Sequence, residues 1–570
     1  MASDKREDLP VYAQAPPRHP SLSKFQLITL ATTFLAILSL ACTKLYPRAP
    51  RQFSSHEDAQ CRAPLPQFLV NHHLSADHPA LRRAARNLDQ ALDAWFSKGG
   101  LDSIAVAVVT SDGSVYEEFR GVLRANETAS EKRGLVDRHS IYRLGSNSKL
   151  FTCLESFILR DRGVVNLDES LDKMFPDLSR GRDPITMRQL MSHMSGIGAD
   201  WPPGDAEGKW PKSRDGAGPP PYNGRHDPDI PMLLDAIGQN PFVARPYTFP
   251  SYSNSGYSLL GVANVAANQA AEGSDAPSTH AELMHRDIFV PLGLNGSSFI
   301  ASNTNKNHLV VASVYPGEID HDLGVVNNPA AGQMGSLSDL VKVMQTLIDP
   351  NRPGSLLRPY TIREWLRPMH AWWDDYSETG LLWEIYKSED SYGRKLRYYQ
   401  KMGGLPGHYT AFTLAPTSSF GVIVLTSGPT LQLIELNRLV FSHFQPAFDA
   451  ITEELTERLI AGEWTSVDEA VQITIIIEAG SLFVSKYVVN GTDVLEATQP
   501  YRGPSALWST GDNEFRLATS MPGSGCLLQW IGLDQYGYIR GFPTNMMRIV
   551  EGSDGVVLQV PAIDVNLERR

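Results

Sequence analysis

The chain has 570 residues, of which 42% are hydrophobic and 20% are charged, and its formal net charge is −12. This composition is that of a globular protein with a sizeable core, and it excludes a chain that is disordered throughout. An acidic chain without a long block of lysine and arginine is a poor candidate for binding nucleic acid, because phosphates must be neutralised by clustered cations. The four cysteines have no zinc-binding spacing and are too few for a disulfide scaffold.

The amino-terminal region predicts a membrane anchor. Residues 1–24 form a polar, proline-containing tail, whereas residues 25–43 contain no charged residue, proline or glycine. A helix over 25–43 would be about 28 Å long, which is close to the hydrocarbon thickness of a bilayer. We therefore expect a transmembrane signal anchor in a single-pass membrane protein. A cleaved signal peptide, which would leave a secreted protein, is the alternative.

Flanking charges and glycosylation sequons predict on which side of the membrane the body of the protein lies. Cations before the span slightly outnumber those after it, which favours a cytoplasmic amino end under the positive-inside rule. The sequons at Asn126, Asn295 and Asn490 would then lie in a lumenal or extracellular body and predict N-glycosylation there.

Two of the cysteines are candidates for a disulfide. Cys42 lies inside the apolar span and Cys153 lies in a predicted helix, which leaves Cys61 and Cys526. A bridge between them would tie the segment after the anchor to the carboxyl-terminal region, and an oxidising compartment would permit it. Unpaired thiols explain the sequence equally well, so both interpretations stay open.

Residues 78–448 predict one large domain of helices and strands behind a linker. The linker, residues 44–77, contains four prolines and no sustained helical or strand period. Residues 199–250 are rich in proline, glycine and tryptophan, and a loop of this length is more often functional or disordered than a simple connection. Apolar periodicity predicts an amphipathic helix over 80–96, a hairpin over 103–109 and 115–119, and helical runs around 150–160 and 186–194.

The pattern changes near residue 449. A short acidic helix over 451–462 is followed by short alternating apolar runs with turn residues between them. These runs predict a small, mostly β carboxyl-terminal domain over 449–570. Its strands are expected at 471–477, 482–489, 514–519, 527–531 and 556–560.

Ser146 and Lys149 form an S-x-x-K motif in a setting that favours catalysis. An apolar helical run follows the motif, so the pair would lie at the amino end of a buried helix. At positions i and i+3 the amine and the hydroxyl share one helix face. Backbone N–H groups and the positive end of the helix dipole at that terminus would stabilise the negative charge of a developing oxyanion. The same motif at Ser21 lies in the tail, which shows that the spacing alone is weak.

Two further motifs strengthen this interpretation. Tyr252 and Asn254 stand in a loop just before an apolar helix, in a Y-x-N arrangement. Lys401 to Gly404 (KMGG) ends a short apolar strand over 396–399, and a glycine pair there permits close approach of a ligand.

In this order the three motifs resemble those of the serine β-lactamase-related hydrolases: class C β-lactamases, penicillin-binding D,D-peptidases, and their esterase and transacylase relatives. The resemblance covers about residues 78–448. It implies an α/β (α+β) fold of the β-lactamase/transpeptidase type, in which helices and a helical subdomain flank an antiparallel sheet. The domain over 449–570 is similar to the extra domain of secreted fungal members. Three further stretches resemble the family: 185–198 (ITMRQLMSHMSGIG), 288–293 (IFVPLG) and 328–340 (NPAAGQMGSLSDL).

The resemblance implies a role for each residue of the motifs. Ser146 would be the acylated nucleophile, and Lys149 would help to deprotonate it. Tyr252 would relay the proton to the leaving group, and Asn254 would orient Lys149 and the substrate. Lys401 would supply positive charge on the far side of the site.

The remaining implied contacts lie on the strand of the third motif. Backbone N–H groups of Ser146 and Gly404 would form the oxyanion hole, and Met402 and Gly403 would contact the substrate. Met402 replaces the threonine of the family's K-T-G motif, which disfavours antibiotic hydrolysis and favours a less anionic acyl substrate. Residues 380–383 (GLLW) also depart from the family's G-x-G-W. The resemblance implies neither a cofactor nor a metal ion.

Other conspicuous side chains receive structural interpretations. His193 is expected to hydrogen-bond in the core and His408 to lie in an exposed turn. Asp374 and Asp375 are expected on the solvated surface. The tryptophans and one tyrosine divide into packing residues (Trp372, Trp373, Trp383) and candidates for lining an acyl-binding cleft (Trp201, Trp210, Tyr222).

The resulting hypothesis is a membrane-anchored serine hydrolase with a Ser-Lys-Tyr acyl-enzyme mechanism. Its substrate would be a small ester, thioester, amide or lactone, a class found in secondary metabolism. The expected partners are this acyl substrate and a membrane contacted through 25–43, with no nucleic acid, and the oligomeric state stays open. An acyltransferase of the same family and a catalytically silent binding protein with the same fold are the alternatives.

Overall fold

The computed structural model describes residues 61–570 apart from 177, 214–215, 500–501, 512, 519–524 and 553–554. The predicted tail (1–24), the predicted anchor (25–43) and the first part of the predicted linker lie outside the described residues. Among the residues that are described, no helix combines the length and the apolar character needed to cross a bilayer.

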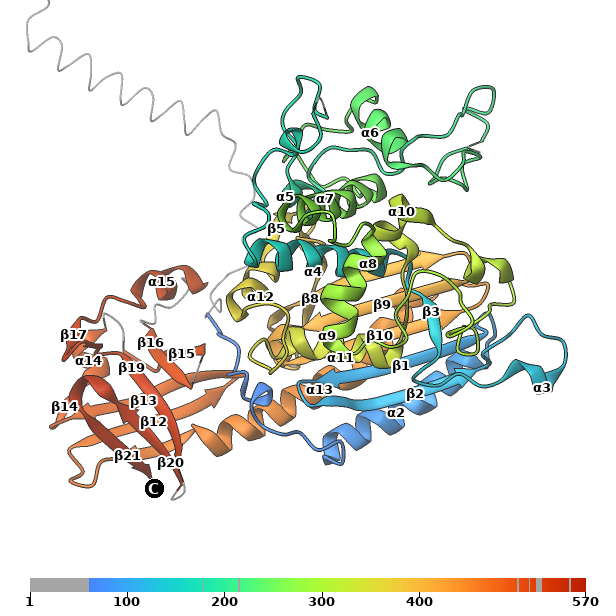
Figure 1. Ribbon diagram of the computed structural model, residues 1–570. Helices are drawn as coiled ribbons and strands as arrows, with labels where there is room; N and C mark the ends of the chain where they lie inside the picture. Colours follow the sequence, from blue (N-terminus) through green and yellow to red (C-terminus); the bar gives the residue numbers. More distant parts are fainter. Residues whose placement is uncertain are drawn as a thin grey trace, which may run out of the picture. The chain divides into compact units, whose positions relative to one another are not determined.

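An eight-stranded antiparallel sheet forms the centre of the large domain (Figure 1). Its strand order is β2-β1-β10-β9-β8-β7-β6-β5, so strands from the beginning and the end of the domain pair with each other next to the β2 edge, with Val106 opposite Val424. The predicted hairpin is confirmed as β1 and β2. The strands are β1 (Ser103–Thr110), β2 (Gly113–Gly121), β5 (Pro368–Ala371), β6 (Ser377–Gly380), β7 (Glu384–Glu389), β8 (Lys395–Leu405), β9 (His408–Ala415) and β10 (Phe420–Ser427).

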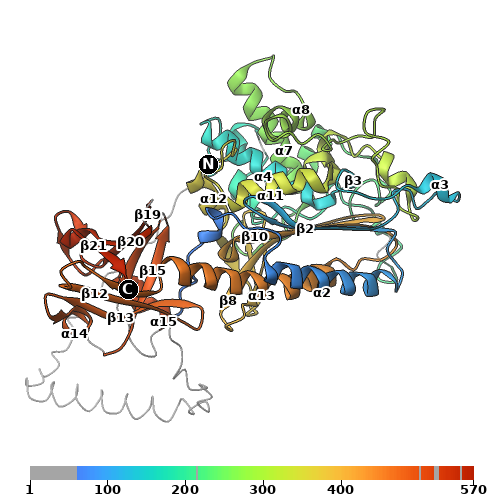
Figure 2. The same ribbon diagram turned by 90° about the horizontal axis from the view of Figure 1, so that it is seen from below.

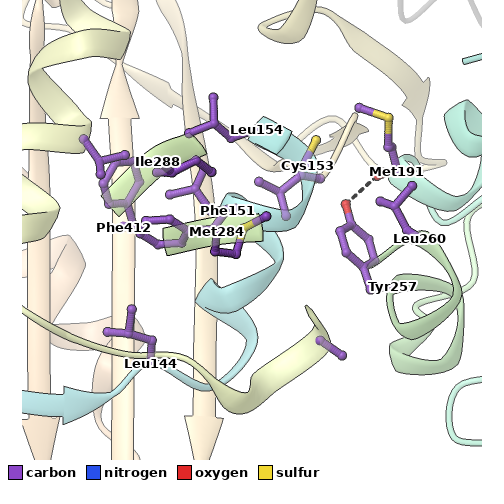
Figure 3. Packing of buried hydrophobic residues seen from close by; sticks show 14 of the residues in the cluster. Leu144, Phe151, Cys153, Leu154, Met191, Tyr257, Leu260, Met284, Ile288 and Phe412 are labelled. Carbon is purple, nitrogen blue, oxygen red and sulfur yellow. Dashed lines mark hydrogen bonds between the residues drawn. The ribbon is translucent and has the colours of Figure 1, made fainter. Parts of the chain in front are cut away.

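Helices cover both faces of this sheet (Figure 2). Alternate residues of a strand point to opposite faces, and β1 shows this directly. Ile104, Val106 and Val108 pack with α2 (Pro79–Phe96) and α13 (Leu433–Leu459), whereas Ala105, Ala107 and Val109 belong to a second core cluster. That second cluster contains α4 (Ser148–Asp161) and α11 (Leu337–Ile348). In Figure 3, Phe151 and Leu154 of α4 lie among Met284, Ile288 and Phe412.

A helical subdomain lies beside α4, and side-chain caps define where its helices begin. Ser253 caps α7 by accepting a hydrogen bond from the Gly256 N–H at 2.8 Å, so Tyr252 immediately precedes the helix and Asn254 opens it. The Tyr257 hydroxyl of α7 donates to the Met191 carbonyl at 2.8 Å, which ties α7 to α5 (Figure 3). The subdomain and nearby helices are α5 (Met187–Met191), α6 (Ile230–Gln239), α7 (Asn254–Glu272), α8 (His280–Met284), α9 (Val290–Leu292), α10 (Gly324–Asn327) and α12 (Pro359–Trp365).

The carboxyl-terminal domain is a barrel. Its nine strands run in the order β12-β11-β21-β20-β19-β16-β15-β13-β14, and an additional pairing of β12 with β13 closes the sheet. Closure pairs the edges that an open sheet would leave exposed. The strands are β11 (Gly462–Thr465), β12 (Val471–Glu478), β13 (Ser481–Val489), β14 (Thr492–Asp493), β15 (Ser505–Gly511), β16 (Glu514–Ala518), β19 (Met546–Gly552), β20 (Gly555–Val560) and β21 (Val565–Arg569).

One predicted strand of this domain is wrong. Residues 527–531 belong to α15 (Gly525–Gly532), a helix. A short apolar run does not distinguish a strand from a helix by periodicity. The helix turns Gln529 inward, where its side-chain oxygen accepts a hydrogen bond from the Trp508 indole at 2.9 Å, while Leu527 and Trp530 remain exposed.

A single helix joins the two domains. The acidic helix predicted over 451–462 is the end of α13, which begins at Leu433 and passes through the predicted boundary between 448 and 449. One continuous core cluster includes Phe444 and Phe448 of α13, Trp464 of β11 and Leu558 of β20. Packing along α13 therefore extends from the sheet of the large domain into the barrel.

The structure also corrects several single-residue interpretations. His408 is buried in β9 rather than exposed in a turn. Trp383 is buried as expected, but Trp373 is 85% exposed. The segment 199–250, expected to be a functional or disordered loop, contains the helix α6 (Ile230–Gln239). Trp201 in this segment is buried, and the Tyr222 hydroxyl donates a hydrogen bond to Glu318 at 2.7 Å.

The structure joins Cys61 to Cys526 and leaves Cys153 free and buried in α4. We predict that peptide mapping without reductant recovers Cys61 and Cys526 in one cross-linked pair. Burial raises the pKa of the Cys153 thiol well above its usual value, so alkylation by iodoacetamide should require denaturation. A native protein in which Cys61 or Cys526 is alkylated without reduction would contradict this pairing.

Candidate active site

The turn that carries Ser146 is fixed by buried hydrogen bonds on both sides. Strand β3 (Ile141–Arg143) leads into a 3₁₀ turn, Gly145–Asn147, and α4 begins at Ser148. The Leu144 N–H donates to the Gln333 carbonyl at 2.9 Å, and the Thr410 hydroxyl donates to the Leu144 carbonyl at 2.8 Å. The guanidinium of Arg143 donates to main-chain carbonyls of Glu318, Ile319, His321 and Gly332. Ser146 is therefore presented by a turn that has little freedom to move.

Strand β8 lies directly against this turn, and two glycines make the contact possible. A Cβ atom on Gly403 would lie 2.0 Å from the Leu144 carbonyl oxygen and 2.6 Å from the Thr410 hydroxyl oxygen. A Cβ atom on Gly145, which has φ of +53°, would lie 2.7 Å from the Gly404 nitrogen. The backbone of residues 403–404 is thereby held beside Ser146 without an intervening side chain.

Lys149 contributes a buried amine to the site, one helical turn after Ser146. Its Nζ donates to Ser146 Oγ at 3.1 Å, to Asn254 Oδ1 at 2.6 Å and to the Ala330 carbonyl at 2.8 Å. Burial lowers the pKa of Lys149, and the positive charge of Lys401 lowers it further, although the Tyr252 phenol acts in the opposite direction. The amine is thus easier to deprotonate than that of an ordinary lysine.

Tyr252 brings a phenol to the same hydroxyl. Its Oη donates to Ser146 Oγ at 2.7 Å. Burial of the phenol acts to raise its pKa, but the positive charges of Lys149 and Lys401 outweigh this effect and leave the pKa of Tyr252 below its usual value. The Nζ atoms of Lys149 and Lys401 lie 4.9 Å and 5.2 Å from the centre of the tyrosine ring. Tyr252 as a whole residue is 40% exposed, so an incoming molecule can reach it.

Asn254 is oriented by an acid that the sequence did not single out. Its Nδ2 donates to Asp200 Oδ1 at 2.7 Å, and its backbone N–H donates to the Ala199 carbonyl at 2.8 Å. The Asp200 bond fixes the amide so that Oδ1 faces the Lys149 amine. Asp200 therefore acts on Lys149 through Asn254.

Lys401 forms an ion pair with a second acid that the sequence analysis missed. Its Nζ donates to Glu384 Oε1 at 2.6 Å and to the Met402 carbonyl at 2.6 Å. The Met402 N–H donates to Glu384 Oε2 at 3.1 Å, so the carboxylate holds both backbone and side chain. Burial acts to lower the pKa of Lys401, but the Glu384 carboxylate prevails and raises it. Lys401 therefore stays a cation.

His193 has a supporting position. Its Nδ1 accepts the Ser253 N–H at 3.1 Å, and its ring centroid lies 4.6 Å from that of Tyr252. Burial lowers the pKa of His193 well below its usual value, and Lys149 and Lys401 lower it further, so the imidazole is neutral at physiological pH. It packs against the phenol and, as expected, hydrogen-bonds in the core.

The predicted substrate contacts on β8 need correction. The side chain of Met402 points to the opposite face of the sheet and packs with the α2–α13 cluster, because adjacent strand residues alternate. Gly403 is buried against the protein's own turn rather than open to a ligand. Strand β8 also does not end before Lys401 but continues to Leu405. Strand β7 pairs with it only as far as Gln400, so the edge at residues 401–405 is unpaired by β7.

Comparison with known proteins identifies the family. The sequence profile of the beta-lactamase family matches residues 81–443. The chain belongs to the beta-lactamase family. Beta-lactamase-like protein str6 of Strobilurus tenacellus is 37% identical over 306 residues, which cover 51% of this chain and 99% of that protein.

Solved structures agree on the fold of this family. The beta-lactamase/D-alanine carboxypeptidase from Yersinia pestis, complexed with citrate, aligns with a TM-score of 0.50 and 20% identity over 64% of this chain and 100% of that chain. A class C beta-lactamase aligns with a TM-score of 0.51 and 16% identity, covering 65% of this chain and 98% of that one. The beta-lactamases and peptidases of the family are serine hydrolases, and their fold is the one described here for the large domain.

The missed acids of this beta-lactamase family member had weak signals in the sequence. Glu384 directly follows the GLLW stretch, which departs from the family's G-x-G-W, and Leu382 in that stretch has φ of +81°. A leucine is strained in this conformation, which glycine adopts freely. Asp200 follows the 185–198 stretch by two residues. Neither position has a periodicity that would have revealed its contact.

The predicted glycosylation sites are accessible. Asn126, Asn295 and Asn490 are all exposed and lie in turns. Their modification stays a prediction.

The contact between β8 and the nucleophile turn can be tested with two glycines. We predict that Gly403→Ala lowers the free energy of unfolding by about 1–3 kcal/mol, because its Cβ has no room beside the Leu144 carbonyl. Gly404→Ala is the matched control, since its Cβ would lie 3.4 Å from the nearest atom, on the Tyr409 ring. Thermal unfolding of the two variants measures the difference. Equal midpoints would show that β8 does not pack against the turn as described.

Proposed function

We propose that the protein is a serine hydrolase in which Ser146 forms a covalent acyl-enzyme. The observation that supports this proposal most strongly is that Ser146 Oγ accepts hydrogen bonds from both Lys149 Nζ, at 3.1 Å, and Tyr252 Oη, at 2.7 Å. Both groups have a lowered pKa, and a base of this kind is what a serine hydroxyl needs to become a nucleophile.

The acylation step follows from these contacts. Lys149, as the neutral amine, accepts the Ser146 proton while Oγ bonds to the substrate carbonyl carbon. The negative charge on the carbonyl oxygen is stabilised by the N–H groups of Ser146 and Gly404, which lie together because β8 packs against the turn. Tyr252 donates its proton to the leaving group as the bond to that group breaks, and Lys149 then passes the serine proton to the resulting phenolate.

Deacylation uses the same groups in reverse. Tyr252 passes its proton to the neutral Lys149 amine, and the resulting phenolate accepts a proton from a water molecule as that water attacks the ester carbonyl of the acyl-enzyme. Ser146 Oγ leaves and takes the proton held by Lys149, whose Nζ lies 3.1 Å away, which restores the neutral amine. Asn254 keeps Lys149 aligned through both steps, and Lys401 favours the phenolate by its positive charge.

The electrostatics favour a substrate that is not anionic. Lys401 is already neutralised by Glu384 at 2.6 Å, so its charge is not free to bind a substrate carboxylate. We therefore propose an ester, thioester, amide or lactone with a neutral or cationic acyl portion. The location of this activity in a lumenal or extracellular compartment, behind an anchor at 25–43, belongs to the same proposal.

The nucleophile can be identified by covalent labelling. We predict that a fluorophosphonate probe adds one adduct to the wild-type protein and none to Ser146→Ala, as measured by intact-protein mass. Ser21→Ala, which removes the serine of the other S-x-x-K motif, is the control and should label like the wild type. An adduct that persists in Ser146→Ala would place the nucleophile elsewhere. The complete absence of adducts would favour a binding protein with this fold.

The role of Lys401 predicts a shift in pH dependence. The labelling rate should rise with pH as the basic group at Ser146 loses its proton, with an apparent pKa below that of an ordinary lysine amine. Lys401→Met removes a positive charge near Lys149 and Tyr252 and leaves the negative Glu384 unpaired, and both changes favour the protonated forms. The apparent pKa should therefore move up. A shift to lower pH, or none, would contradict the proposed role of Lys401.

A further inference from the structure

Helix α15 of the barrel (Figure 1) turns its apolar side to solvent and its polar side to the protein. Gln529 and Gly532 are buried, and Gln529 accepts a hydrogen bond from the Trp508 indole at 2.9 Å. Four apolar residues are exposed: Leu527, Leu528, Trp530 and Ile531. At about 100° per residue these four positions form one continuous arc of about 160°, with Gln529 on the opposite side. A helix on the surface of a globular protein ordinarily has the reverse arrangement, with its apolar stripe against the core.

Helix α15 carries no charged residue, and a hairpin with further exposed apolar residues follows it. The hairpin pairs β17 (Tyr538–Ile539) with β18 (Phe542–Pro543), and Tyr538, Ile539 and Phe542 are exposed. Large exposed apolar patches mark sites of interaction with proteins, ligands or membranes. Tryptophan and tyrosine are enriched where proteins meet the membrane–water interface, because their rings are apolar with one polar group. This composition favours a lipid surface over a charged partner.

The chain enters the described structure at the start of this helix. Cys61 is bonded to Cys526, the second residue of α15. Close to this bond, the Ala63 carbonyl accepts hydrogen bonds from Arg394 Nη1 at 2.9 Å and from Ser481 Oγ at 2.7 Å. The covalent bond and these hydrogen bonds fix the entering segment to the body. Whatever precedes Cys61 is therefore attached at the first turn of α15.

A short segment joins this point to the predicted anchor. Residues 44–60 connect the apolar run 25–43 to Cys61, and these 17 residues span at most about 60 Å when fully extended. If 25–43 crosses a bilayer, the tether to that bilayer is attached to the body at α15. Contact between α15 and the bilayer is then an intramolecular event, and such tethering strengthens an interaction that is weak by itself. The position of the tether and the apolar face of the helix therefore indicate the same occupant.

We propose that the outward face of α15 inserts into the interfacial region of the bilayer that holds the predicted anchor. The inference rests on the anchor that the proposed function includes, and it adds a second membrane contact, which the folded body makes itself. Leu527, Leu528 and Ile531 enter the boundary between headgroups and acyl chains, and the Trp530 indole lies at the headgroup level. Because α15 has no charge, zwitterionic lipid is sufficient for this contact.

The fluorescence of Trp530 tests the proposal in the full chain. The protein is reconstituted into phosphatidylcholine vesicles with or without lipids that are brominated on the acyl chains near the headgroup, since bromine quenches tryptophans that enter the bilayer. No tryptophan precedes Cys61 in the sequence, so the anchor itself gives no signal. Because Trp530 is one of ten tryptophans, we expect the brominated lipid to remove about a tenth of the emission. Added salt should leave this loss unchanged.

Three variants assign the loss of emission to the face of α15. Trp530→Phe removes the reporter and should abolish the loss. Leu527→Gln combined with Ile531→Gln keeps the reporter but makes the face polar, so the loss should fall by about half or more. Trp373→Phe is the matched control, because Trp373 is an exposed tryptophan of the large domain, and it should keep the full loss. All four side chains are exposed, so these substitutions remove no core packing.

Extraction of the vesicles with alkaline carbonate separates the inference from the anchor. A chain that resists extraction but whose Trp530 is not quenched by brominated lipid would keep the anchor and overturn the inference. Protection of Trp530 from aqueous acrylamide in that case would show that residues 25–43 or a second copy of the chain cover α15 instead. Quenching of Trp530 in a chain that carbonate extracts would support the lipid contact and overturn the anchor. Labelling of Ser146 by the fluorophosphonate reports the hydrolase independently of all these outcomes.

Discussion

The contact of strand β8 with the turn before α4 positions every other group in the site. Residues 403 and 145 are glycines at the two points where a side chain would collide with the opposing backbone. The Thr410 hydroxyl, which receives a hydrogen bond from the Asn147 amide at 2.7 Å and donates one to Leu144, closes the same contact from β9. Because the strand and the turn are fixed together, the serine hydroxyl and the N–H groups beside it keep a fixed position relative to each other. Tyr252 and Asn254 reach the serine from the start of α7, whereas Lys149 comes from α4 and Lys401 from β8.

Two buried ammonium groups beside one phenol determine the chemistry available there. Burying a charge is unfavourable unless it is paired and hydrogen-bonded. Lys401 is paired with Glu384 and remains charged, whereas Lys149 has only neutral acceptors in Asn254 and Ala330 and loses its proton more readily. The same difference makes one lysine a source of positive charge and the other a base. In the proposed function, this pairing also leaves Lys401 without a free charge for an anionic substrate.

The sequence was sufficient for the parts of the site that depend on local patterns. The S-x-x-K motif at a helix start, the Y-x-N motif before an apolar helix and the KMGG strand each had a short-range signature, and the structure brings Ser146, Lys149, Tyr252, Asn254 and Lys401 together. Contacts between distant segments had no such signature. Asp200 and Glu384 are ordinary surface acids in the sequence, and only the folded chain shows that they hold Asn254 and Lys401. The face of β8 to which Met402 points, the length of α13 and the helix at 527–531 were decided by packing, which local periodicity does not encode.

The most direct test of this account is a crystal structure of the protein after reaction with a fluorophosphonate. The account predicts phosphorus bonded to Ser146 Oγ, a phosphoryl oxygen within hydrogen-bond distance of the Ser146 and Gly404 N–H groups, and Tyr252 Oη beside the position of the departed fluoride. An adduct on Ser146 whose phosphoryl oxygen points away from Gly404, with Tyr252 or Lys149 out of contact, would contradict it.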